Sequence, residues 1–327
     1  MHTLCPRTSR LFPLALAGLL GCSGKTASQA PGPRAPISSS DSTSDSSSDS
    51  TTHPHGPRFA FDFLRRNPRP DKPRTRGLTE VRGPYYTVVG KRYLADLLET
   101  MGPYIDSFKF SGGSFMLMDR EVVQELIDLC HQHDVLVSTG GFIEAVLPHG
   151  PEAVERYIDE AAHLGFDIIE VSNGMIVLPD EDFVRIVERV AAAGVKAKAE
   201  IGIQLGAGSS TATAELQAEG TRDTTAVIAL GRRLLDAGAW MLMLQAEGVT
   251  ENVTQWRTDV ISRVATELGT ERVMFQAADP SVLRWYVKSY GSDVNLFVDH
   301  SQIIQLESLR SGTWGPKSLW GRVLRYP

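Results

Sequence analysis

Charged, amide and hydroxyl side chains recur where short apolar, β-rich runs end between Arg76 and the carboxyl terminus. In chain order they are Thr79, Glu80 and Arg82; Lys109; Ser138, Thr139 and Glu144; Glu170, Ser172 and Asn173; Lys198 and Glu200; Gln245 and Glu247; Gln276; and Asn295, Asp299 and His300. Lysine can bind an anion or deliver a proton, and carboxylates can hold a divalent cation or transfer protons. Side chains of these types point to one polar pocket.

Lys109 is flanked by aromatic residues and is followed by the turn Ser111-Gly112-Gly113-Ser114. Backbone N–H groups of such a turn near a helix start can cradle an anion, although glycine pairs are also common in ordinary turns. Lys109 is then a cation aimed at an anionic substrate or a proton donor; the alternative is a surface lysine on an edge strand.

Glu170 and Glu200 end two successive apolar runs. Two carboxylates at one level could share Mg²⁺, which prefers oxygen ligands; the alternative is that each is the ion-pair partner of a buried Lys or Arg. His300 after Asp299 is either an acid/base group or a structural histidine.

The sequence lacks the motifs that would indicate several other kinds of chemistry. His-Glu-x-x-His and Gly-x-Ser-x-Gly are absent, and the three cysteines, Cys5, Cys22 and Cys130, form no metal-binding or disulfide spacing. The formal net charge of −6, from 33 Lys and Arg against 39 Asp and Glu, argues against a general nucleic-acid binder.

Short apolar runs alternate with longer segments of helical period, which is typical of parallel β/α architecture. Eight strands are expected at residues 78–81, 105–110, 135–139, 168–172, 195–201, 241–245, 272–276 and 294–298. Eight units in the 252 residues from 76 to 327 predict an α/β (β/α)8 TIM barrel. An open doubly wound sheet is the runner-up, but the Gly-x-Gly-x-x-Gly loop typical of many such folds is absent. A barrel places its active site at the carboxyl ends of the strands.

The first 75 residues differ from the rest. Residues 1–22 combine Arg7 and Arg10 with a short apolar run ending at Cys22, like a secretory leader with a lipobox-like end. Residues 23–75, rich in Ser, Asp and Pro, are expected to form a disordered linker. Alternatively, a translation start placed too far upstream attaches foreign sequence to the barrel domain, 76–327.

Several ordered motifs resemble the phosphosulfolactate synthase family. They are Arg76-Gly-Leu-Thr79, Asp106-Ser-Phe-Lys109-Phe, Ser138-Thr-Gly140-Gly141-Phe-Ile-Glu144, Ile169-Glu170-Val-Ser172-Asn-Gly, Ala199-Glu200-Ile-Gly, Val294-Asn295-Leu and Leu306-Glu307-Ser-Leu-Arg310-Ser-Gly. The plant branch, the heat-stress-associated 32-kilodalton proteins, looks most similar, with stretches such as Thr79-Glu-Val-Arg-Gly-Pro-Tyr-Tyr86.

The resemblance implies a lyase that adds sulfite to phosphoenolpyruvate with Mg²⁺, giving 2-phospho-3-sulfolactate on a route to coenzyme M. It assigns catalysis to Lys109, Glu144 and Glu200, and the metal to Glu170 and Glu200. Substrate binding falls to Arg76, Thr79, Ser111, Gly112, Gly113, Gly140, Gly141, Ser172, Asn295 and Arg310.

The chain departs from the synthase pattern at several positions. Ile203-Gln204 stands where synthases typically carry lysines, Gln245 and Gln276 where acids are expected, and Asn173 where Asp is usual. An amide cannot supply the charge of a carboxylate or take a proton as a base. The alternative function is therefore a stress-associated protein that retains the barrel without the reaction and acts through protein contacts.

Location and assembly follow less directly from the sequence. The family resemblance implies a cytoplasmic protein, whereas lipidation of Cys22 would give a lipid-anchored one, including a sugar- or phosphate-binding surface lipoprotein. Trp285, Trp314 and Trp320 near the carboxyl terminus indicate either a homo-oligomer interface or packing of outer helices.

Overall fold

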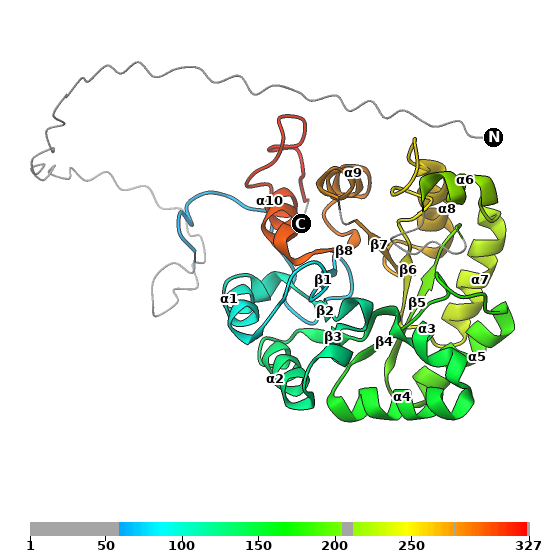
Figure 1. Cartoon of the computed structure of the whole chain (residues 1–327). Helices are drawn as coiled ribbons and strands as arrows, with labels where there is room; N and C mark the ends of the chain where they lie inside the picture. The colour runs from blue at the N-terminus through cyan, green and yellow to red at the C-terminus, as the bar shows by residue number, and fades with distance from the viewer. Residues whose placement is uncertain (1–58, 205–211, 278, 326–327) are drawn as a thin grey trace, which may run out of the picture. The chain divides into compact units, whose positions relative to one another are not determined.

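The computed structural model describes residues 59–204, 212–277 and 279–325. Eight parallel strands close into a barrel in the order of the chain (Figure 1). The strands are β1 (Thr79–Arg82), β2 (Ser107–Lys109), β3 (Leu136–Ser138), β4 (Ile168–Val171), β5 (Lys196–Ile201), β6 (Met241–Leu244), β7 (Val273–Gln276) and β8 (Asn295–Asp299). This confirms the predicted (β/α)8 TIM barrel, and each strand lies within three residues of its predicted bounds.

Helices surround this barrel. They are α1 (Lys91–Met101), α2 (Arg120–His131), α3 (Ile143–Val146), α4 (Pro151–Leu164), α5 (Asp180–Ala192), α6 (Thr213–Glu219), α7 (Thr224–Asp236), α8 (Thr258–Leu268), α9 (Pro280–Tyr290) and α10 (Ile303–Ser311). Short 3₁₀ turns are η1 (Gly102–Tyr104), η2 (Ser111–Leu117), η3 (Gly140–Phe142), η4 (Leu147–His149) and η5 (His300–Gln302). Within the described ranges, no helix is long and apolar enough to cross a membrane.

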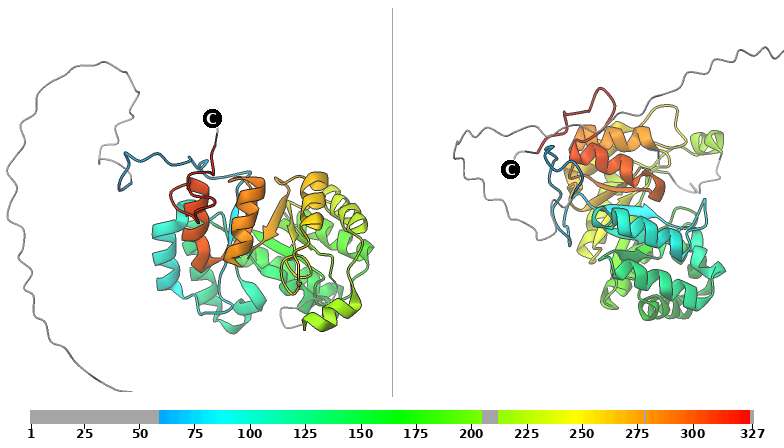
Figure 2. Two further views of the ribbon diagram at one scale, coloured as in Figure 1. Left: turned by 90° about the horizontal axis from the view of Figure 1, so that it is seen from above. Right: turned by 90° about the vertical axis from the view of Figure 1, so that its left-hand side faces the viewer.

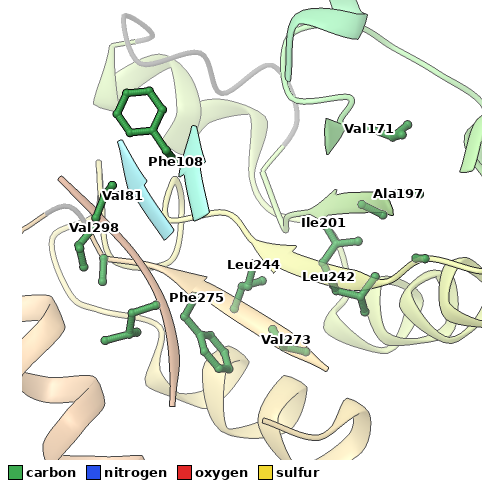
Figure 3. Packing of buried hydrophobic residues seen from close by; sticks show 14 of the residues in the cluster. Val81, Phe108, Val171, Ala197, Ile201, Leu242, Leu244, Val273, Phe275 and Val298 are labelled. Carbon is green, nitrogen blue, oxygen red and sulfur yellow. The ribbon is translucent and has the colours of Figure 1, made fainter. Parts of the chain in front are cut away.

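Alternation along the strands separates two environments. Buried side chains such as Val81, Phe108, Leu242 and Phe275 belong to the large cluster shared with the surrounding helices (Figure 3). Because successive strand residues point to opposite faces, their neighbours point into the barrel. There a small apolar cluster of Leu78, Met241, Met243, Met274 and Phe297 shares the interior with charged side chains.

The amino-terminal end of the barrel is closed by a strap of residues 67–75. Asn67 Nδ2 donates to the carbonyl of Arg310 at 3.0 Å, Arg69 pairs with Glu307 at 3.0 Å, and Arg74 pairs with Asp106 at 2.9 Å. The sequence analysis predicted that residues 67–75 belong to a disordered linker. A segment that is held by polar contacts shows no apolar periodicity, so the sequence does not indicate that it is ordered. The rest of the predicted linker up to residue 58, and the predicted leader, lie outside the described residues.

Four residues assigned to substrate binding lie at this closed end instead of at the strand carboxyl ends. Thr79 and Asn295 begin β1 and β8, and Arg310 lies near the end of α10, which runs antiparallel to the strands. Arg310 is fully buried and donates to Thr79 Oγ1, to Glu307 at 3.0 Å and to the carbonyl of Val294 at 2.6 Å.

The other two of the four residues also bind the protein itself. Asn295 Oδ1 accepts from the Leu78 N–H at 2.8 Å, whereas Arg76 is exposed and lies 3.4 Å from Asp293. Their polar groups thus hold the closed end of the barrel together.

We expect Arg310→Met to lower the free energy of unfolding by about 3 kcal/mol, because it breaks a buried ion pair and leaves carbonyls without donors. Urea unfolding of the full chain measures this change. The matched control, Arg76→Met, removes an exposed pair and should cost less than about 1 kcal/mol. Equal losses in the two variants would contradict a structural role for Arg310.

Candidate active site

A cavity of about 340 Å³ opens at the carboxyl ends of the strands. Its lining includes the predicted site residues Lys109, Ser111, Gly112, Gly113, Gly141, Glu144, Glu170, Ser172 and Glu200. Gln245, Glu247, Glu251, Gln276 and Phe297 complete its far wall. Most of the predicted residues are therefore brought together from β2, β4, β5 and the loops after β2 and β3.

Lys109 forms the floor of the cavity through an ion pair. Its Nζ lies 2.7 and 2.8 Å from the two carboxylate oxygens of Glu170 and 4.4 Å from the centre of the Phe297 ring. Lys109 is 7% exposed, which rules out a surface lysine. The ammonium faces the cavity from a fixed position.

The ion pair continues downward into the barrel. Lys198 Nζ lies 2.9 Å from Glu170 and 2.6 Å from Glu80, and all three residues are buried. Burial opposes ionisation of Glu170, but Lys109 and Lys198 together hold its pKa well below the usual value. Burial likewise disfavours the charged Lys198, yet Glu170 and Glu80 raise its pKa. Glu170 is thus a lysine partner, the alternative that the sequence left open.

Glu144 anchors the loop after β4. Its carboxylate accepts hydrogen bonds from the Ser172 hydroxyl at 2.5 Å and from the N–H groups of Gly174 at 3.1 Å, Met175 at 2.7 Å and Ile176 at 3.2 Å. Both oxygens are therefore engaged. This geometry makes Glu144 and Ser172 positioning residues for the cavity wall; a catalytic role for Glu144 stays a prediction.

Two glycine turns let backbone approach Lys109. Gly140 has φ +61°, and a Cβ there would lie 2.7 Å from the Phe110 carbonyl and 3.3 Å from Lys109 Cε. Gly113 has φ +65° and lies against the Phe142 ring, so its turn also requires glycine. The Ser111 hydroxyl beside this turn is buried without a hydrogen-bond partner among the described residues.

Arg82 was left out of the predicted site residues, although it ends β1. It pairs in register with Lys109 on β2 and is 8% exposed. Its guanidinium lies 5.1 to 5.7 Å from the ring centres of Tyr85, Tyr86 and Phe297, and Nη1 has no hydrogen-bond partner among the described residues. A buried cation with a free donor at a cavity wall is suited to an anionic ligand.

Carboxyl groups gather on the other side of the cavity. Burial, with the nearby Glu170 charge, raises the pKa of Glu200 to about 8, and burial together with Glu251 raises the pKa of Glu247 to about 7. The pKa of Glu251 is also raised, chiefly by burial. Glu247 Oε2 is buried with no partner in the part of the chain that the structure describes. In the sequence, only the position of Glu247 after the run that forms β6 indicated that this residue belongs to the site.

His300 supports Arg82 from behind. Its Nδ1 lies 2.8 Å from the Arg82 carbonyl oxygen, so Nδ1 donates, and its ring packs edge-on against Tyr93. His300 does not line the cavity, which favours the structural reading. Gln245 and Gln276 do line it, in place of the acids that the family pattern expects.

Three known proteins are similar in sequence to this chain. HEAT-STRESS-ASSOCIATED 32 of Arabidopsis thaliana is 37% identical over 252 residues, which cover 74% of this chain and 88% of the relative. Phosphosulfolactate synthase of Methanothermobacter thermautotrophicus is 29% identical over 265 residues, covering 78% and 96%. The Methanocaldococcus jannaschii enzyme of the same name is 25% identical over 232 residues, covering 68% and 88%.

These relatives agree with a match to a whole-domain family profile. The matched region, residues 67–316, starts at the strap and ends just beyond α10, so it contains the entire barrel and its cavity. It confirms the resemblance seen in the sequence motifs. The chain belongs to the (2R)-phospho-3-sulfolactate synthase (ComA) family.

Proposed function

We propose that this chain is a phosphosulfolactate synthase-like lyase that adds sulfite to phosphoenolpyruvate and forms 2-phospho-3-sulfolactate. Family membership supports a lyase-type enzyme. The observation that carries the proposal is the adjacent pair Arg82 and Lys109, two buried cations beside a glycine turn in a small cavity. Such a site suits a small molecule with several negative charges.

Lys109 is the proton donor in this proposal. The sulfur lone pair of sulfite attacks C3 of the enol phosphate, and the electron pair of the C2–C3 double bond moves to C2 and its carboxylate. Lys109 Nζ then transfers a proton to C2, so one C–S and one C–H bond form and no group leaves. Glu170 holds the ammonium at 2.7 Å, and water returns the proton to the lysine afterwards.

Arg82 takes the anion-binding role that the family resemblance assigned to Arg310. Its free Nη1, the Ser111 hydroxyl and the N–H groups of the Gly112-Gly113 turn surround one side of the cavity. Charge-assisted hydrogen bonds from these donors fit a phosphate or sulfite group.

The residues fit magnesium only in part. Glu170 does not, because both of its oxygens already accept from lysines. Among the described residues, no three His, Cys, Asp or Glu side chains form a ready metal cluster. Glu200 and Glu247 do fit, since their raised pKa values and the unpartnered Glu247 oxygen mark carboxylates that lack a cation. These two residues would hold Mg²⁺, which would supply positive charge to offset the substrate carboxylate and the negative charge that develops during the reaction.

A stress-associated protein without this reaction is the second candidate. Identity to the plant relative, 37%, exceeds the 29% and 25% to the two synthases. At the position where synthases typically carry lysines, Gln204 instead donates to the Gly220 carbonyl at 3.0 Å and leaves no cation there. Under this reading the barrel would act through protein contacts.

Purified full-length protein should convert phosphoenolpyruvate and sulfite into 2-phospho-3-sulfolactate when Mg²⁺ is present. Phosphorus NMR and mass spectrometry follow the loss of substrate and the appearance of product. A folded protein that forms no product over hours would overturn the synthase proposal and favour the second candidate.

Lys109→Met and Arg82→Gln should affect different kinetic constants. Loss of the proton donor should lower kcat by about 100-fold or more, whereas loss of a charged hydrogen bond to the anion should raise KM by about 10- to 100-fold. Steady-state kinetics separates these effects. Lys91→Met, which removes an exposed lysine paired with Glu125, is the control and should match the wild type. If Lys109→Met retained full kcat, its assigned role would be excluded.

Stability should fall as pH rises through the range where Glu247 ionises. The unfolded chain releases this proton near pH 4.5, whereas the folded pKa is about 7, so the folded state holds more protons between these values. The free energy of unfolding should therefore decrease from pH 5 to pH 8, and Glu247→Gln should recover up to about 3 kcal/mol of that loss.

Urea unfolding at pH 5 and pH 8, without divalent metal, measures the difference between wild type and variant. Glu121→Gln, in the exposed first turn of α2, is the control and should keep the wild-type slope. A Glu247→Gln variant with an unchanged slope would show that this carboxyl does not ionise unfavourably in the fold.

A further inference from the structure

Exposed apolar side chains gather on two segments, residues 61–67 and 313–325. They are Phe61 (73% exposed), Phe63 (82%), Leu64 (58%), Trp314 (63%), Trp320 (54%) and Leu324 (78%). The rings of Trp314 and Trp320 lie 4.7 Å apart. Trp285, by contrast, packs against Trp256 and Tyr286, so it contributes to the barrel exterior and not to this surface.

The two segments form one surface, which we call the basal face. Asn67 Nδ2 donates to the Val323 carbonyl, and the Arg325 guanidinium donates to the Pro68 carbonyl at 3.0 Å. In both views of Figure 2 the blue segment before β1 lies close to the red segment after α10. The Asn67 N–H also donates to the Ser311 carbonyl, at the end of α10. Because α10 runs antiparallel to the strands, the basal face lies at the closed end of the barrel, opposite the cavity.

The basal face is basic although the chain is acidic overall. Residues 61–67 and 313–325, which form this face, carry five Lys or Arg side chains and one Asp, within a chain of net charge −6. Arg65, Lys317 and Arg322 are exposed beside the aromatic residues. Asp62, the one acid of these two segments, pairs with Arg66 at 3.2 Å, and Arg325 pairs with Asp293 at 2.9 Å.

Exposed Trp and Phe interspersed with Lys and Arg are typical of surfaces that lie at a membrane interface. Docking this face on the same face of a second copy would bring like charges together, which disfavours a symmetric dimer. We propose that the basal face docks on an anionic lipid surface. The cavity at the opposite end then stays open to solvent.

This proposal does not rest on the proposed reaction. It agrees with the lipobox-like end at Cys22, because one acyl chain holds a protein only marginally and a basic surface supplies the second attachment. Each exposed cation near an anionic leaflet strengthens binding, so the attraction should weaken with salt.

The test uses full-length Cys22→Ser protein, which removes any contribution of lipidation. Co-sedimentation is measured with phosphatidylcholine vesicles with and without phosphatidylglycerol. Binding should require phosphatidylglycerol and fall with added salt, and the pair Lys317→Ala and Arg322→Ala should weaken it by about 30-fold. Trp314→Ala with Trp320→Ala should weaken it as well, also at high salt.

Controls at the other end of the molecule are Leu117→Ala, a 91% exposed apolar residue, and Lys91→Ala. Both should bind vesicles like the parent protein, and circular dichroism should show all variants folded. The proposal is overturned if folded protein ignores phosphatidylglycerol vesicles, or if basal and control variants bind alike. Sedimentation showing self-association that Trp314→Ala abolishes would assign the face to a second copy instead.

Discussion

The candidate site depends on a chain of alternating charges inside the barrel, from Glu80 through Lys198 and Glu170 to Lys109. Burying a single charge in a protein interior costs several kcal/mol, and a partner offsets that cost only when the geometry is good. Here each inner charge contacts two opposite ones at hydrogen-bond distance. The chain thereby fixes the height of Lys109 at the cavity floor, and removing Lys198 or Glu170 would leave Glu80 or Lys109, respectively, as a buried charge without its partner.

The two lysines and two glutamates of this chain of charges balance one another, so the residues of the walls determine the net charge of the cavity. Arg82 is the cation on one wall, and Glu200, Glu247 and Glu251 face it from the other side. Glu247 is buried and Glu200 and Glu251 are half-buried, so these carboxyls resist ionisation, which is what their raised pKa values express. An anionic substrate therefore fits this cavity together with a cation or with protons on these carboxyls. The balance of charges in the cavity, more than the positions of its atoms, therefore determines which ligands it can bind.

The fold could be predicted because eight apolar runs that alternate with segments of helical period are the pattern of a closed (β/α)8 barrel. The ends of these runs then indicated polar side chains that line the cavity, including Lys109 and Glu170. Two features of the structure could not be predicted from the sequence. The sequence shows that Glu144 follows β3, but not that a loop folds back to saturate its carboxylate. The strap at residues 67–75 has no periodicity, and its contacts are with carbonyl and carboxylate groups that no sequence pattern reveals.

Arg82 and Arg310 show why residue type alone does not place the anion site that we propose. Both are buried arginines next to β1, and either could bind a phosphate. Arg310 spends its Nη1 and Nη2 donors on Thr79, Glu307 and the carbonyl of Val294, so little remains for a ligand. Arg82 keeps Nη1 unpaired among the described residues and lies at the end of its strand, whereas Thr79 starts the same strand. The direction of β1 alone could have shown that Thr79 and Arg82 lie at opposite ends of the barrel. How many guanidinium donors of each arginine already have protein partners can be seen only in the structure.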